Sequence, residues 1–161
     1  MENSRKKQNN SGMSLIEIVV VVLILGILSA GAVVGFSFIR SRDASSAAET
    51  IVSLLNRTKT ETLASKETVK LQVMKDGNKF YGKIIKGSEE IDKVEIGGNG
   101  ISIVATGGGS SLTIDMSHPC EISYNKSNGA FSSSTYTKFV ITGAKTSTVY
   151  MVTGTGRCYM E

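Results

Sequence analysis

The order of apolar and polar positions divides the chain into three parts. Residues 18–39 form a run of 22 residues without a charge. From Ala44 to Leu63 apolar residues recur at spacings of three and four, the period of an amphipathic helix. Beyond residue 68 apolar and polar residues alternate in short runs, which glycine-rich segments separate. The pattern therefore predicts one long helix followed by a β-rich region.

The helix is expected to be continuous over about fifty residues, from Ser14 to about Ser65. Its second half carries an apolar stripe, which Thr58 and Thr62 continue, and most charged residues lie off this stripe. The apolar members of the stripe are Ala44, Ala47, Ala48, Ile51, Leu54, Leu55 and Leu63. This face is predicted to cover a β-sheet.

The β-rich region is predicted to consist of short strands joined by tight turns. The expected strands are residues 69–73, 79–85, 93–96, 101–105, 112–115, 121–124, 138–142 and 148–153. Glycine and asparagine cluster between them, as antiparallel hairpins require. The predicted fold class is α+β, with a long N-terminal helix packed on an antiparallel β-sheet domain.

The charge-free run is long enough to cross a membrane. As a helix it would measure about 33 Å, against roughly 30 Å of bilayer hydrocarbon. Arg5, Lys6 and Lys7 precede it, which favours a cytoplasmic N-terminus and an exported C-terminal part, whereas Arg40 and Arg42 on the far side oppose that orientation. The first basic cluster usually dominates, so we expect a single pass with the C-terminal domain exported.

A secretory signal is one alternative for this N-terminus. Such a signal has a shorter apolar region and a small-residue cleavage site after it. Here the apolar run is long, and no clean A-x-A site lies at its end. The polar leader stops instead at Gly12, and Glu17 stands at the edge of the apolar run. A carboxylate in a membrane segment is usually functional, although an interfacial acid remains an alternative.

The segment SGMSLIEIVVVVLILGIL resembles the class III signal of type IV prepilins and pseudopilins. The resemblance implies cleavage by a prepilin peptidase after Gly12, N-methylation of Met13 and a role for Glu17 in assembly. Two departures are modest. Met13 stands where phenylalanine is commoner, and Val34 lies near the place where many pilins have a proline.

The same resemblance divides the chain into three regions. Residues 1–12 would be the cleaved leader, residues 13–40 the membrane-spanning and filament-core helix, and residues 41–161 an exported α+β domain with a type IV pilin-like fold. Two later segments, EISYNKSNGAF and VYMVTGTGRCYM, loosely resemble the GspH/FimT-like minor pseudopilins and minor pilins. That subgroup resemblance implies a closing strand that ends at Gly156-Arg157.

The charge distribution gives little support to a nucleic-acid partner. The chain has a net charge of +4 and a pI near 9.1. The first twelve residues contribute a net +2 of this, and basic and acidic residues are mixed over residues 57–93. FimT-like relatives serve competence, so a DNA-binding minor pilin remains an alternative, although no basic stripe supports it.

The remaining reactive residues do not form a catalytic set. Cys120 and Cys158 would either join in a disulfide, worth about 3–4 kcal/mol in the chain-entropy description, or stay as free thiols. His118, beside Pro119, is expected in a turn. No nucleophile, base and metal ligands converge in the sequence, so we expect no enzymatic activity, no metal, no cofactor and no small-molecule ligand.

The sequence as a whole favours a structural subunit of a filament, either a minor pilin or a pseudopilin. The machine would be a type IV pilus, a type II secretion pseudopilus or a competence filament. The expected partners are a prepilin peptidase, other pilins or pseudopilins, and the cytoplasmic (inner) membrane, before assembly into a cell-surface or periplasmic filament. An unrelated single-pass membrane-anchored protein is the other alternative.

Overall fold

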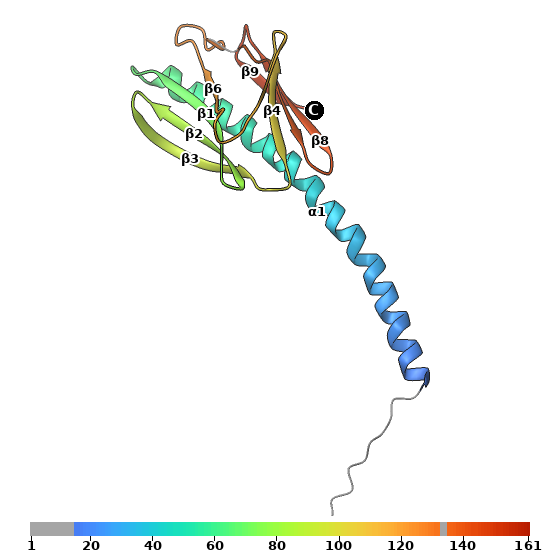
Figure 1. The fold of residues 1–161 in the computed structure, drawn as a ribbon. Helices are drawn as coiled ribbons and strands as arrows, with labels where there is room; N and C mark the ends of the chain where they lie inside the picture. Colours follow the sequence, from blue (N-terminus) through green and yellow to red (C-terminus); the bar gives the residue numbers. More distant parts are fainter. Residues whose placement is uncertain (1–14, 133–134) are drawn as a thin grey trace, which may run out of the picture. The chain divides into compact units, whose positions relative to one another are not determined.

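The structure is a computed structural model that describes residues 15–132 and 135–161, without the side chains of residues 27–42. It consists of one helix followed by nine strands in the described residues (Figure 1). The chain divides into two compact units, residues 1–36 and residues 37–161. The helix α1 (Leu15–Ala64) has residues in both units, and all of the strands belong to the second, which we call the globular unit.

The predicted helix is confirmed, since α1 runs without interruption for 50 residues. Its stripe from Ala44 to Leu55 is buried as expected. Leu63 is the exception, because its side chain is 52% exposed. Thr58 and Thr62 continue the buried face instead, because Thr58 lies three residues after Leu55 and Thr62 four residues after Thr58, which keeps them in line with the stripe.

The two buried threonines do not leave unpaired hydroxyl groups in the core. The Thr58 hydroxyl donates to the carbonyl of Leu54 at 2.7 Å, and the Thr62 hydroxyl donates to the carbonyl of Thr58 at 2.7 Å. Both bonds reach back four residues along the helix, which satisfies the polar atom without a partner from another element. The stripe can therefore end on threonines and still pack against the sheets.

Sheet A is antiparallel, with the strand order β3-β2-β1-β6. Its strands are β1 (Val69–Asp76), β2 (Lys79–Lys86), β3 (Glu89–Gly97) and β6 (Cys120–Ser123). Two-residue turns that begin with Gly77 and Gly87 join the first three strands, and both glycines have a positive φ near 60°. The second turn was not predicted, and β3 begins four residues earlier than expected because Glu89-Glu90-Ile91-Asp92 has no clear apolar alternation.

Sheet B is also antiparallel, with the strand order β5-β4-β7-β8-β9. Its strands are β4 (Ser102–Gly107), β5 (Ser110–Thr113), β7 (Lys138–Thr142), β8 (Thr146–Val152) and β9 (Arg157–Met160). The strand expected at residues 112–115 is shifted, because β5 ends at Thr113 and Asp115 precedes the bend at residues 116–117. Its carboxylate accepts bonds from the backbone N–H groups of Ser117 and His118, and a hydrogen bond from the His118 ring lowers the pKa of Asp115.

The ends of β8 and β9 correct the sequence analysis. The subgroup resemblance implied a last strand ending at Gly156-Arg157, but residues 153–156 form a turn and β9 begins at Arg157. Gly156 has φ 59°, and a Cβ at this position would collide with the carbonyl oxygen of Gly129. The turn is therefore fixed by a glycine and by a contact with a distant loop, which local patterning does not reveal.

The globular unit has two sheets where a single one was expected. The inner faces of both are apolar: Val69, Leu71, Val73, Ile84 and Ile122 in sheet A, and Ile103, Phe139, Ile141, Val149 and Met151 in sheet B. Gly82 of β2 lets the Leu54 side chain approach the backbone of sheet A. Phe131 links the sheets, because it forms an isolated bridge with Tyr124 and its N–H donates to the carbonyl of Thr153 at 3.2 Å.

The Gly156 turn generates a stability prediction. Gly156→Ala should lower the free energy of unfolding by about 2 kcal/mol or more, because alanine is strained at positive φ and its Cβ meets the Gly129 carbonyl. This corresponds to a fall of roughly 5–10 °C in the melting temperature of the purified chain in detergent. Gly154→Ala is the matched control, since a Cβ there meets nothing within 4 Å. Equal melting temperatures for the two variants would contradict the proposed contact.

A second prediction concerns the independence of the globular unit. A fragment of residues 41–161 should be soluble and folded, because the buried stripe of α1 and both inner sheet faces are retained in it. Circular dichroism should show helix and strand together, and thermal unfolding should be cooperative. An unfolded fragment would show that the residues before 41 are needed for the fold.

Candidate assembly site on the N-terminal helix

The described start of α1 is apolar on every face. Among residues 15–26, Glu17 is the sole charged residue, and the side chains around it are exposed, with Leu15 at 80%. The other exposed large side chains are Ile16, Ile18, Val19, Val20, Val21, Val22, Leu23, Ile24 and Leu25. A helix that is hydrophobic all round is stable only in lipid or among other apolar helices. This segment therefore requires surroundings that the chain does not itself provide.

The structure describes only part of the predicted membrane span. The side chains of residues 27–42, which overlap most of the run at 18–39, lie outside the described residues. In what is described, no helix combines the length and the hydropathy that a membrane crossing needs.

Of the predicted processing residues, only Glu17 falls within the described part of the chain. Gly12 and Met13, the expected cleavage site and methylated residue, lie outside it. Glu17 is in the first turn of α1, where a carboxylate interacts favourably with the positive end of the helix dipole. Its side chain is exposed within this chain, so the residue is accessible to a partner.

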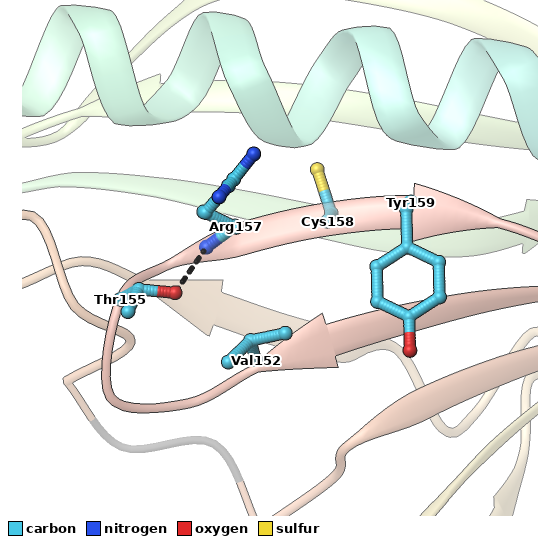
Figure 2. A pocket seen from close by; sticks show the side chains of 5 residues that line it. All are labelled: Val152, Thr155, Arg157, Cys158 and Tyr159. Atoms are coloured by element: carbon cyan, nitrogen blue, oxygen red, sulfur yellow. Dashed lines mark hydrogen bonds between the residues drawn. The ribbon is translucent and has the colours of Figure 1, made fainter.

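The two cysteines are both free thiols, so the bond allowed for in the sequence analysis is not formed. Cys120 is buried on the inner face of β6, and burial raises the pKa of its thiol to about 12. Cys158 lies on β9 and points toward α1 (Figure 2), where its thiol is 3.4 Å from the Asn56 side-chain oxygen and 3.8 Å from the Val52 carbonyl oxygen. Burial also raises the pKa of Cys158, so neither thiol is activated as a nucleophile.

A shallow hollow of about 410 Å³ lies on the turn between β8 and β9 (Figure 2). Its lining residues are Val152, Thr155, Arg157, Cys158 and Tyr159. Arg157 is its one charged side chain, and the backbone N–H of Arg157 donates to the Thr155 hydroxyl at 3.4 Å. Among the described residues, no three His, Cys, Asp or Glu side chains gather as a metal site would need.

One contact that the sequence analysis missed holds this turn in place. The Lys59 ammonium group, on α1, donates to the carbonyl oxygen of Thr155 at 2.9 Å and to that of Gly156 at 3.3 Å. Lys59 lies next to the buried stripe, among the charged residues that were expected off it. No local sequence signal pairs it with a turn 96 residues away.

Comparison with known proteins bears on the N-terminal segment. Residues 7–33 match the prokaryotic N-terminal methylation motif. Neither the curated proteins nor the solved structures compared with this chain give a match. The motif spans the predicted cleavage site and the first part of α1, including Glu17. This motif is the class III prepilin signal, so over these residues the chain is similar to type IV pilins and pseudopilins.

Proposed function

We propose that this chain is a minor pilin or pseudopilin that assembles into a filament through its N-terminal helix. One observation carries the proposal: the methylation motif at residues 7–33 continues into a helix whose described start is exposed and apolar on every face. A processing signal joined to such a helix is what a subunit needs if it leaves a membrane to enter an apolar bundle. The motif also implies a structural protein and not an enzyme.

The proposed sequence of events begins in the inner membrane, where the motif implies that the chain is anchored. A prepilin peptidase cleaves after Gly12 on the cytoplasmic side, and Met13 becomes the N-methylated first residue. The globular unit is exported, and the mature chain then passes into a periplasmic or cell-surface filament. The machine is a type IV pilus, a type II secretion pseudopilus or a competence filament, and the GspH/FimT-like subgroup remains a hypothesis from the sequence.

Glu17 gives this assembly its register. Cleavage creates a positively charged amine at Met13, about one helical turn from Glu17. In a bundle of apolar helices an unpaired charge is costly, whereas a hydrogen-bonded pair offsets much of the cost. The amine of one subunit would pair with Glu17 of its neighbour, and this pairing would select one axial position among many apolar ones.

The outer face of sheet A carries paired charges, as a surface exposed to water does. Four ion pairs cross it: Lys70–Glu121, Lys79–Glu95, Lys83–Glu90 and Lys93–Asp76. Arg57 of α1 is paired with Asp92 of β3. Because the basic residues in this region are balanced by neighbouring carboxylates, this surface does not form the basic stripe that a DNA-binding minor pilin would use.

The cleavage site provides the first test of the proposal. Gly12→Asp should block leader removal, because a peptidase that accepts a minimal side chain before the scissile bond cannot seat a carboxylate there. Unprocessed precursor should accumulate in the membrane, as measured by mass spectrometry of the membrane-bound chain. Asn10→Asp adds the same charge two residues earlier and should leave processing intact. Normal mature protein from Gly12→Asp would overturn the class III assignment.

Glu17 provides the second test, because it should separate insertion from assembly. Glu17→Val should keep membrane insertion and leader cleavage, since the substitution lowers the cost of placing the helix in lipid. Incorporation into filaments should fall by more than a hundredfold, because removing one partner of a buried pair costs about 3–5 kcal/mol.

The measurement is the amount of each variant recovered with sheared filaments or with partner pilins, at matched membrane levels. Glu17→Asp keeps the charge on a shorter side chain and should recover part of the incorporation. Equal incorporation of Glu17→Val and the unaltered chain would remove the charge-pair mechanism, while the leader-cleavage test would remain independent of it.

A further inference from the structure

Four strands form the outer edges of the two sheets in the described part of the chain: β3 and β6 in sheet A, and β5 and β9 in sheet B. An unpaired edge can recruit another strand unless charge, irregularity or short length protects it. β3 carries five charged residues and two register shifts against β2, β5 is a short polar strand, and β6 is short and includes Glu121. β9 differs, because two adjacent residues near its end, Tyr159 and Met160, have exposed side chains.

The apolar surface at β9 is larger than that of a single residue. Tyr159 is 53% exposed and Met160 is 40% exposed, and Val152 at the end of β8 is 42% exposed. Tyr159 stacks on Tyr150 of β8 with ring centres 5.3 Å apart. Figure 2 shows that Tyr159 points away from α1. The β8–β9 hairpin thus combines an open sheet edge with an exposed aromatic surface.

The hydrogen bonds of the hairpin show which backbone groups of β9 point away from β8. The N–H of Thr148 donates to the carbonyl of Glu161, and the N–H of Glu161 donates to the carbonyl of Thr148, both at 2.9 Å. Such doubly bonded pairs alternate with non-bonded pairs along an antiparallel ladder. Tyr159, two residues from Glu161, therefore also bonds to β8. Cys158 and Met160 direct their N–H and C=O groups to the open edge.

We propose that β9 pairs with β9 of a second copy of this chain, antiparallel and about a two-fold axis at Tyr159. Cys158 of one copy then lies opposite Met160 of the other, so that the residues whose backbone groups point away from β8 meet and can exchange both hydrogen bonds. Arg157 of one copy lies opposite Glu161 of the other. The two Tyr159 residues stand opposite each other at the axis.

This register is selected by two independent features of β9. A shift by one residue would place Cys158 and Met160 opposite residues whose backbone groups point toward β8, so no ladder could form. A shift by two residues restores the hydrogen-bond phase but separates Arg157 from Glu161. Only the pairing centred on Tyr159 satisfies both the backbone groups and the opposite charges across the edge.

The pairing is short, so the copies must be held near each other for it to form. A four-residue strand offers few hydrogen bonds, and the contact is smaller than a typical stable interface. The inner-membrane anchor that the motif implies confines the copies to a surface, which raises their effective concentration. The proposed dimer therefore belongs to the anchored chain, and it does not depend on filament assembly.

The test is disulfide trapping of the full chain in cell membranes. Cys120→Ala and Cys158→Ser remove the native thiols, and Tyr159→Cys places one thiol at the proposed axis. Residues opposite each other in a non-hydrogen-bonded pair have Cα atoms about 4.5 Å apart, which suits a disulfide. Oxidation with copper phenanthroline should give a product of twice the chain mass on a non-reducing gel.

Tyr150→Cys in the same background is the matched control. Tyr150 occupies the same row on β8, one strand from the edge, so its two copies would be about three strand spacings, or roughly 14 Å, apart. Its disulfide trapping should be at least tenfold weaker than that of Tyr159→Cys.

A second pair of cysteines leaves Tyr159 unaltered. Co-expressed Arg157→Cys and Glu161→Cys chains should cross-link with each other, because these positions are opposed across the axis.

Charge reversal gives a specific readout of the register. Arg157→Glu should reduce trapping at Tyr159→Cys at least fivefold, and adding Glu161→Arg should restore it, because the ion pair is then reversed between the copies. Absence of the double-mass product from both cysteine designs, equal trapping at Tyr150→Cys, failure of the reversal to restore trapping, or a product of another mass would overturn the proposal. Leader cleavage, measured in the same cells, reports on the proposed function separately.

Discussion

The buried stripe of α1 between Ala44 and Thr62 is the contact on which the globular unit depends. Sheet A reaches it where Leu54 packs over Gly82, and β9 of sheet B reaches the helix beside it, where the Cys158 thiol meets the carbonyl of Val52. The sheets are also linked through Phe131. Because the small residues of the stripe allow close approach, a single helix can serve as the common core element of two sheets.

The first turns of α1 have a different relation to their surroundings. In the globular unit the apolar residues of the helix occupy one face and are buried by the chain itself. Between residues 15 and 26 they occupy every face and are exposed. The same secondary structure is therefore completed in one part by the protein's own strands and in the other by lipid or neighbouring helices. In the proposed assembly, Glu17 is the polar residue that would give the second part a preferred position.

Most of the fold could be predicted from the sequence because its periodicity is clear. The change of period near residue 68 located the end of the helix, and β7 was predicted with its observed bounds. The division of the strands into two sheets and the presence of β9 were not predicted, because both depend on contacts between residues that are distant in the sequence. Gly156 forms its turn against the loop at Gly129, and no pattern within a few residues of Gly156 indicates that partner. Thr58 and Thr62 were correctly placed on the buried stripe, whereas Leu63 was assigned to it as well but is half exposed, because it lies one position past Thr62 on the helix.

The candidate site divides in a similar way. The motif with Gly12, Met13 and Glu17 is contiguous, so it can be recognised in the sequence, and the match over residues 7–33 confirms the motif itself. The chemistry of the cysteines could not be deduced in this way. The direction of the Cys158 side chain depends on which face of β9 meets α1, and that strand was not predicted.

The contact of Lys59 with the carbonyl oxygens of Thr155 and Gly156 has a consequence for how the protein folds. It joins residues about a hundred positions apart, as does the contact of Val52 with Cys158. Contacts of such high sequence separation form late, since a long loop must close before they are made. If the C-terminal part is translocated after the helix, as the proposed function implies, the β8–β9 hairpin reaches the far side after most of the globular unit. These contacts then form only once that hairpin has crossed, and until that moment the edges of the incomplete sheets remain open to chaperones and to proteases.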